Sequence, residues 1–293
     1  MKKIITHNGN FHADDIFAVA TLQLIFEKEG EEFEVIRTRD EEIIKTGNFV
    51  IDVGGIYDAD KNLFDHHMLE GAGERENKIP YASFGLVWKK FGIELCGSDE
   101  VVSRIDKKLA QPIDAIDVGI DLFKNIIDGV YPYLMHSFLT SLKPTWKEQD
   151  LNENIMFDKA VNFAKEILQR EIKITQDITE AEVTVIEAYN KAKDKRIIVM
   201  DKKYPWESIL SRYEEPLYAI YPNVSWRVKA VRDDFGSFEN RKDLPESWAG
   251  KSDEELAEIT GVSDAVFCHR ARFLAGAKSK EGAIKLAQIA LDA

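Results

Sequence analysis

Two histidines and two aspartates lie within ten residues near the start of the chain. The stretch "THNGNFHADD", residues 6–15, contains His7, His12, Asp14 and Asp15, although the whole chain has only six histidines. Imidazole and carboxylate groups together are the donors that many divalent metals prefer. Ten residues cannot complete a metal site alone, so this stretch indicates one only if other segments supply further ligands.

Three further segments carry groups of the same kind. They contain Asp52 in "NFVIDVGG", Asp65, His66 and His67 in "LFDHH", and Asp114 and Asp117 in "IDAIDVG". Neighbouring residues on an extended strand point to opposite faces, so adjacent histidines serve one site only where the strand has ended. This predicts that His66 binds a metal while His67 faces a reacting phosphate.

The elements that must position these groups alternate between strand and helix. Strands are expected over 2–6, 32–38 and 48–55, with helices over 14–30 and 40–47 between them. This order favours a parallel sheet with right-handed crossovers. In such a sheet functional groups gather just beyond the carboxyl ends of the strands, where His7 and Asp52 stand. We therefore expect the four segments to converge at one edge of the sheet.

The rest of the chain continues as an α/β protein. Further helices are expected at about 81–92, 98–117 and 153–192, the last of which bridges two parts of the chain. A second α/β unit follows, with strands over 195–201, 216–222, 225–231 and 264–269 and helices over 251–261 and 279–293. The boundary is expected near residue 190, which gives domains of 1–190 and 191–293.

The charge distribution, apolar runs and cysteine positions limit which classes of protein are possible. The net charge of −13 lies entirely in residues 1–194, because Lys and Arg balance Asp and Glu over 195–293. This distribution fits divalent metal binding in the first part and anion binding in the second, although solubility alone explains it equally well. No apolar run is long enough to span a membrane, and the first residues do not resemble a signal peptide. Cys96 and Cys268 lie outside any CxxC pattern, so we expect reduced core thiols in a cytoplasmic protein.

Each candidate residue also has a purely structural interpretation. Asp52 before two glycines fits turn chemistry, and Asp15 fits the first turn of a helix by its charge alone. For Asp114, local capping or pairing is favoured over metal binding, and His136, without acidic neighbours, is interpreted as structural. The predicted site would be absent only if every one of these structural interpretations were correct.

Long stretches of the chain resemble a known family. "THNGNFHADD", "IRTRD", "DVGGIYD", "FDHH", "SWRVKAV", "SWAGKSDEEL" and "VFCHRARFLAGAKSKEGA" are similar to the Myg-one (melanocyte proliferating gene one) family of the DHH phosphoesterase superfamily. The resemblance implies a Rossmann-like, parallel-sheet DHH domain that carries two divalent metals, followed by a smaller α/β domain that binds substrate. Members hydrolyse phosphoester or phosphoanhydride bonds.

The resemblance also implies residue roles. His7 and His12 would hold the first metal and Asp14 the second, Asp52 would bridge both, and His66 and Asp117 would complete the second. His67 would contact the scissile phosphate, and Asp65 would orient a histidine. His12 stands where superfamily relatives often have a carboxylate, which shifts the expected metal from magnesium to manganese or another transition metal and leaves open whether His12 is a ligand. The expected cations for other substrate phosphates are His269, Arg270, Arg272 and Lys278.

The ligand set and the resemblance together imply a two-metal phosphoesterase, and the resemblance implies more specifically a 3′-to-5′ exonuclease on RNA or short oligonucleotides. A phosphohydrolase of pyrophosphate or nucleotide phosphates, and a catalytically idle metal- or nucleotide-binding regulator, remain as alternatives. Because histidine ligands bind metals as neutral imidazoles, activity should favour neutral to alkaline pH. A homo-oligomer is left open.

Overall fold

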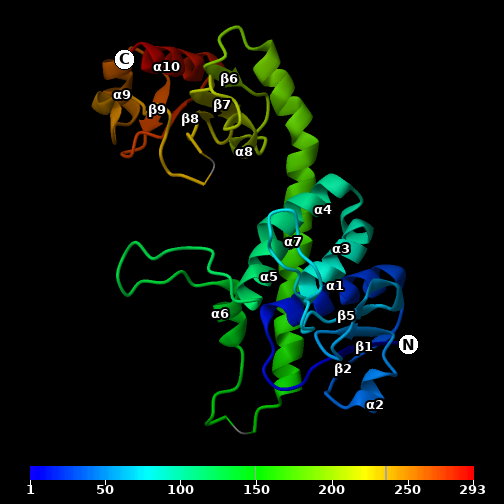
Figure 1. Ribbon diagram of the computed structural model, residues 1–293. Coiled ribbons are helices and arrows are strands. Elements are labelled where there is room, and N and C mark those ends of the chain that lie inside the picture. The colour runs from blue at the N-terminus through cyan, green and yellow to red at the C-terminus, as the bar shows by residue number, and fades with distance from the viewer. Residues whose placement is uncertain (149, 235) are drawn as a thin grey trace. The chain divides into compact units, whose positions relative to one another are not determined.

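The computed structural model describes residues 1–148, 150–234 and 236–293 and divides into two compact units, Met1–Gln176 and Asp177–Ala293 (Figure 1). The first unit is built on a five-stranded sheet of order β2-β1-β3-β5-β4, in which only β4 runs antiparallel to its neighbour. Its strands are β1 (Lys2–Thr6), β2 (Phe33–Arg37), β3 (Phe49–Ile51), β4 (Tyr57–Asp58) and β5 (Leu63–Phe64).

Alternating side chains of this sheet enter two separate cores. Ile4 and Ile51 join the large core that contains the helix α1 (Ala13–Glu29), whereas Ile5 and Val50 face the opposite side, against the short helix α2 (Glu41–Ile44). This alternation is the expected consequence of the two-residue repeat of a strand. The predicted parallel sheet with intervening helices is thereby confirmed.

The helix α1 is buried along most of its length. Every residue from Ala13 to Phe26 is buried, and the helix ends at Gly30, whose φ of 70° closes it in the left-handed conformation. The other helices of this unit are α3 (Ser83–Cys96), α4 (Asp99–Ile105), α5 (Gln111–Asp117) and α6 (Met135–Thr140). The helix α3 packs directly on α1.

The helix expected over 98–117 is interrupted. Between α4 and α5 the segment Asp106–Ala110 forms a π-helical turn, in which the Gln111 N–H bonds to the carbonyl oxygen of Asp106. Pro112 follows immediately and has no N–H for an α-helical bond, which explains why the regular pattern breaks here. The turn precedes α5, which carries Asp114 and Asp117.

The long helix α7 (Glu153–Lys191) belongs to both units. Its first part packs into the core of the first unit through Phe157, Val161 and Leu168. The division between the units falls after Gln176, inside α7, whereas the sequence predicts a boundary at the end of this helix.

The second unit contains a five-stranded sheet of order β6-β7-β8-β10-β9, in which only β6 and β7 are parallel. Its elements are β6 (Ile197–Val199), α8 (Glu207–Leu210), β7 (Tyr218–Pro222), β8 (Trp226–Ala230), α9 (Asp253–Thr260), β9 (Ala265–Cys268), β10 (Leu274–Ala277) and α10 (Lys280–Asp292). The strand β10 is absent from the sequence-based expectation, because "LAGA" lacks the β-branched and aromatic residues typical of strands.

The predicted α/β class is confirmed in both units, each of which combines helices with a sheet that includes parallel strands. Cys96 and Cys268 are both buried thiols. Among the described residues, no helix is both long and apolar enough to cross a membrane.

Candidate metal centre

The predicted convergence of four segments is present in the first unit. His7 follows β1, Asp52 follows β3, and Asp65, His66 and His67 follow β5. Asp14 lies in the first turn of α1 and Asp117 ends α5. Parallel strands bring their carboxyl ends to one edge, and both helix ends meet them there. The geometry at this edge decides what the cluster can do.

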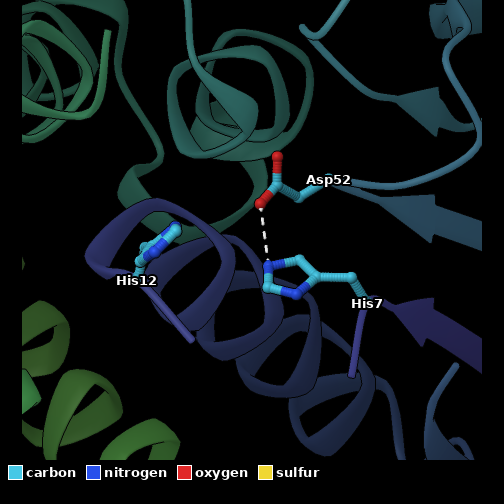
Figure 2. Close-up of side chains that lie close together, drawn as sticks. All are labelled: His7, His12 and Asp52. Atoms are coloured by element: carbon cyan, nitrogen blue, oxygen red, sulfur yellow. Dashed lines mark ion pairs between the residues drawn. The ribbon is translucent and has the colours of Figure 1, made fainter. Parts of the chain in front are cut away.

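Asp52 lies at the middle of the cluster and faces two histidines with its two oxygens. Its Oδ2 lies 3.2 Å from Nε2 of His7, and its Oδ1 lies 3.2 Å from Nε2 of His66. Figure 2 shows the His7 ring pointing at this carboxylate, with His12 nearby at the start of α1. One carboxylate that serves two histidines in this way has the arrangement of a bridging ligand.

The backbone and a neighbouring hydroxyl fix the orientation of Asp52. Its φ of 57° lies in the left-handed region, which non-glycine residues adopt rarely but Asp and Asn more readily than others. The Ser83 hydroxyl, at the first residue of α3, donates a 3.1 Å hydrogen bond to Oδ1. Strained backbone is characteristic of functional sites, and here it turns the carboxylate away from the strand.

Asp14, Asp117 and His12 form the other side of the cluster. The Nε2 atom of His66 lies 3.3 Å from Oδ2 of Asp117 and 3.6 Å from Oδ2 of Asp14. His12 is less closely engaged, since its Nδ1 lies 3.9 Å from Oδ1 of Asp117. The structure thus brings together all six of the residues that the resemblance assigned to metals.

Asp65 fixes His67 and does not join the central carboxylates. It accepts hydrogen bonds from the backbone N–H groups of Gly55, His66 and His67, and its Oδ1 lies 2.8 Å from Nδ1 of His67. The His67 side chain is 62% exposed. Because Nδ1 is held by Asp65, Nε2 is the ring atom left for a ligand. This is the geometry expected of a carboxylate that orients a histidine.

The ionisable side chains of the cluster strongly shift one another's pKa values. Burial lowers the pKa of His66, but the close carboxylates of Asp117 and Asp52 outweigh it and raise the pKa to about 10. Burial likewise opposes the rise of the His7 pKa that Asp52 and Asp15 produce. For Asp52, burial acts to raise the pKa, but His66 and His7 bring it well below the ordinary value. Buried carboxylates of this kind require positive charge close by.

Several buried polar atoms of the cluster have no hydrogen-bond partner in the part of the chain that the structure describes, and bound divalent cations would take that place. Both carboxylate oxygens of Asp14, Oδ2 of Asp15 and Nε2 of His66 are buried without a hydrogen-bond partner among the described residues. Leaving such groups unpaired is costly, and a bound cation removes that cost. Three groups of donor atoms lie within 4.8 Å of one another: His7, His12 and Asp52; Asp52, His66 and His67; and His12, Asp14 and Asp117.

Two cavities adjoin the cluster. A cavity of about 660 Å³ is lined by His7, His12, Asp52 and His67 and also by Arg39. A second of about 170 Å³ is lined mainly by aliphatic side chains, together with Lys108, Asp117 and His136. The ring of His136 lies 5.9 Å from that of His12, centre to centre, so this histidine stands close to the cluster.

Asp114 and Asp15, which were not expected to bind metal, form hydrogen bonds or ion pairs with other protein groups. Asp114 lies 2.8 Å from Arg75 and accepts a hydrogen bond from the Gly85 N–H, in agreement with its local pairing. A Cβ at Gly85 would lie 1.9 Å from Asp114, so only glycine fits there. Asp15 accepts a bond from the His12 N–H, as a helix-capping residue does, but its Oδ2 also lies 3.3 Å from Nε2 of His7.

Sequence reasoning missed Ser83 and Arg39. Ser83 reaches Asp52 only because α3 begins beside β3, and "PYASFGL" contains no signal of that contact. Arg39 belongs to "IRTRD", a stretch that carries the family resemblance but no recognisable chemistry of its own. Its place in the larger cavity is a consequence of the fold.

The four cations expected in the second unit lie near the two ends of one strand. His269, Arg270 and Arg272 lie in the turn between β9 and β10, where Arg272 pairs with Asp243 at 3.0 Å. Lys278 follows the other end of β10. The structure does not gather all four into one cluster.

Comparison with known proteins relates nearly the whole chain to one family. The chain is 31% identical to a MYG1 protein of Schizosaccharomyces pombe, over 99% of this chain and 97% of that protein. It is 30% identical to the human MYG1 exonuclease, over 99% of this chain and 85% of that protein.

Among solved structures, RecJ from Thermus thermophilus in complex with Mn²⁺ is similar with a TM-score of 0.31 and 10% identity. That match covers 100% of this chain, which spans about half of that RecJ chain (52%). The family model named MYG1_exonuc, described as an uncharacterised protein family (UPF0160), matches residues 3–291. The chain therefore belongs to the MYG1_exonuc family.

Proposed function

We propose that this protein is a two-metal phosphoesterase that acts as a 3′-to-5′ exonuclease on RNA or short oligonucleotides. The observation that carries the proposal is the position of Asp52, whose two oxygens face His7 and His66 at 3.2 Å each. A carboxylate placed between two histidine-containing groups could bridge two divalent cations. In this proposal His7 and His12 hold one cation, and Asp14, His66 and Asp117 hold the other.

Two divalent cations bound by these residues would supply a water nucleophile and charge stabilisation at the scissile phosphate. The side chains around them have separate tasks. The Ser83 hydroxyl donates to Oδ1 of Asp52 and so holds the orientation of that carboxylate. His67, held at Nδ1 by Asp65, directs Nε2 to a non-bridging phosphate oxygen. Its exposure gives the substrate access from the larger cavity.

Two observations favour a nucleotide substrate over pyrophosphate. Relatives that align over nearly the whole chain are named exonucleases. The smaller cavity next to Asp117 is lined mainly by aliphatic groups such as Ile113, Ile116 and Leu134, which suit a nucleobase and not a second phosphoryl group.

The second unit is proposed to bind phosphates of the substrate. His269, Arg270 and Lys278 are exposed and carry, or can carry, positive charge suited to phosphate oxygens. Arg272 contributes only if its pair with Asp243 exchanges for a phosphate. In this proposal residues 1–190 form the catalytic domain and 191–293 the substrate-binding domain.

Manganese is the metal we propose, because a donor set that mixes three histidines with carboxylates is softer than the oxygen sets typical of magnesium. Magnesium or another transition metal is the alternative. The proposal also places the enzyme in the cytoplasm, where two unpaired buried cysteines stay reduced.

The test is release of mononucleotides from a 5′-labelled RNA oligonucleotide with manganese present. We expect stepwise shortening from the 3′ end that requires metal and is abolished by Asp52→Ala. Pyrophosphate and nucleoside phosphates are assayed in parallel. Hydrolysis of those compounds alone would identify the small-molecule alternative, and inactivity of the metal-loaded protein on every substrate would contradict the proposal.

A further inference from the structure

Arg39 is a cation in the wall of the metal-site cavity that the roles assigned so far do not use. It lines the cavity of about 660 Å³ together with His7, Asp52 and His67. Its side chain is exposed, and within the described residues no hydrogen bond or ion pair engages it. The other polar side chains of that wall are carboxylates, histidines and asparagines, so Arg39 gives the cavity its one permanent positive charge among the described lining residues.

The backbone places Arg39 firmly beside the metal centre. The Thr38 N–H bonds to the Thr6 carbonyl at 2.8 Å, one residue before His7. The Asp40 N–H bonds to the Thr38 hydroxyl at 3.0 Å. The first bond extends the pairing of β1 and β2 to the edge where the candidate metal ligands gather, and the second holds the turn around Arg39. The backbone position of Arg39 is therefore tied to that of His7.

The charged residues close to Arg39 in the sequence form contacts elsewhere. Asp40 accepts bonds from the N–H groups of Glu42 and Ile43 and so caps α2, and among the described residues it forms no ion pair with Arg39. Arg37, two residues earlier, donates to the carbonyl of Gly9 at 2.6 Å and lies over the Phe157 ring. Arg37 thus braces the loop of His7 and His12, whereas Arg39 stays available to a ligand.

We propose that Arg39 binds a second phosphate group of the substrate, one that is not cleaved. Guanidinium binds phosphate through paired hydrogen bonds, and a position next to the metals suits a phosphate adjacent to the scissile one. The inference rests on the proposed phosphoesterase function and adds to it that the preferred substrate carries at least two phosphates. That second phosphate belongs to the next link of an oligonucleotide or to the other half of pyrophosphate, and the substrates below separate these sources.

The kinetic test compares two dinucleotides that differ only in a 5′-phosphate. The one without it has a single phosphate, which must occupy the metals, whereas the phosphorylated one also reaches Arg39. For Arg39→Ala we expect KM for the 5′-phosphorylated dinucleotide to rise about tenfold, with kcat little changed. The unphosphorylated dinucleotide should be cleaved as by the wild type. Arg39→Lys should recover part of the loss, because lysine keeps the positive charge but cannot form the paired hydrogen bonds of a guanidinium.

Lys45→Ala is the matched control. It removes one positive charge from an exposed residue of the same unit that pairs with Glu42 and does not line the cavity. Its kinetics should equal those of the wild type. An equal loss in Lys45→Ala and Arg39→Ala, or equal losses of Arg39→Ala on both dinucleotides, would overturn the inference. A loss confined to pyrophosphate would retain the second-phosphate role and assign it to the small substrate.

A binding measurement separates this inference from the proposed function. Calorimetry with manganese present compares a nucleoside 3′,5′-bisphosphate with the corresponding 5′-monophosphate. Arg39→Ala should weaken the bisphosphate about tenfold and leave the monophosphate unchanged. If the wild type cleaves nothing but shows this difference, the proposed function fails and the role of Arg39 stands. If the wild type cleaves oligonucleotides but the variant binds both ligands normally, the role of Arg39 fails alone.

Discussion

His7 Nε2 and Asp52 Oδ2 lie 3.2 Å apart, although the two residues belong to segments well separated in the sequence. Each follows a strand of the parallel sheet, and β1 and β3 are hydrogen-bonded neighbours. The same Asp52 carboxylate faces His66 with its other oxygen. This pair therefore joins the N-terminal loop to the DHH segment in one cluster.

Asp52→Asn should remove the activity without removing the fold. Asparagine tolerates the left-handed φ of 57° that Asp52 adopts, so the backbone keeps its course while the bridging negative charge is lost. We expect activity on the RNA oligonucleotide to fall roughly 100-fold or more, as for loss of a direct metal ligand. Thermal unfolding of the metal-free protein should change by only a few degrees. Asp60→Asn, at an exposed position of the same unit, should behave as the wild type.

Ser83→Ala tests whether the orientation of Asp52 matters. The substitution deletes the 3.1 Å hydrogen bond to Oδ1 in a fully buried place. Residues that orient metal ligands in this way are worth about 10- to 100-fold in metal affinity or activity. The expected result is weaker manganese binding by that factor, with partial recovery of the rate at high manganese. Wild-type metal affinity in Ser83→Ala would show that the hydroxyl has no such role.

Manganese binding should release protons and strengthen as the pH rises. The pKa of His66 is raised from 6.5 to about 10, so His66 carries a proton near neutral pH in the absence of metal, and the pKa of His7 is shifted in the same direction. A cation must displace the protons that these histidines carry, so affinity should increase between about pH 6.5 and 10. Calorimetry in buffers of different ionisation enthalpy counts the released protons. A pH-independent affinity without proton release would contradict the assignment of both histidines as ligands.

The same shifts predict the opposite trend for stability without metal. A histidine whose pKa is raised in the folded state contributes stability that is complete below pH 6.5 and is lost towards the folded value of about 10. Metal-free protein should therefore unfold at lower denaturant concentration at about pH 9.5 than at about pH 6.5. Saturating manganese should remove or reverse this difference.

Arg75→Ala should damage stability and not the chemistry. Arg75 contacts Asp114 and Asp106 at 2.8 Å each, and its side chain is only 6% exposed. Without it the buried Asp114 has no counter-charge and must either take up a proton or remain an unpaired anion, a loss of about 3–5 kcal/mol of unfolding free energy. Burial already raises the pKa of Asp114 to about 7, against the effect of Arg75. Denaturant unfolding measures the change, and the manganese stoichiometry of the folded variant should match that of the wild type.

The strands of the first sheet that carry buried apolar residues could be predicted from sequence. The runs at β1 and β3 indicate buried strands, and the rule that function gathers at strand ends then places His7 and Asp52 together. The two-residue strands β4 and β5 are too short for a periodic signal. The mainly antiparallel order of the second sheet could not be predicted either, because pairing direction is set by the paths of the connections.

The candidate site could be predicted only as far as its residue types allow. Histidine and aspartate are recognisable donors, but Ser83 and Arg39 acquire their places through contacts between distant segments. The sequence indicates only a helix-starting role for Asp15, and the fold shows that its second oxygen also faces His7. His136, interpreted from sequence as structural, lies beside the cluster for the same reason, since a helix distant in sequence packs near α1.

The number of manganese ions bound per chain tests the two-metal centre most directly. Titration calorimetry combined with elemental analysis should give two ions per wild-type chain at saturation. In Asp52→Asn at least one of them should be lost or weakened by orders of magnitude, because the bridging carboxylate is gone. A wild-type chain that binds one ion or none at saturation, or an Asp52→Asn variant that keeps both with unchanged affinity, would contradict the two-metal centre.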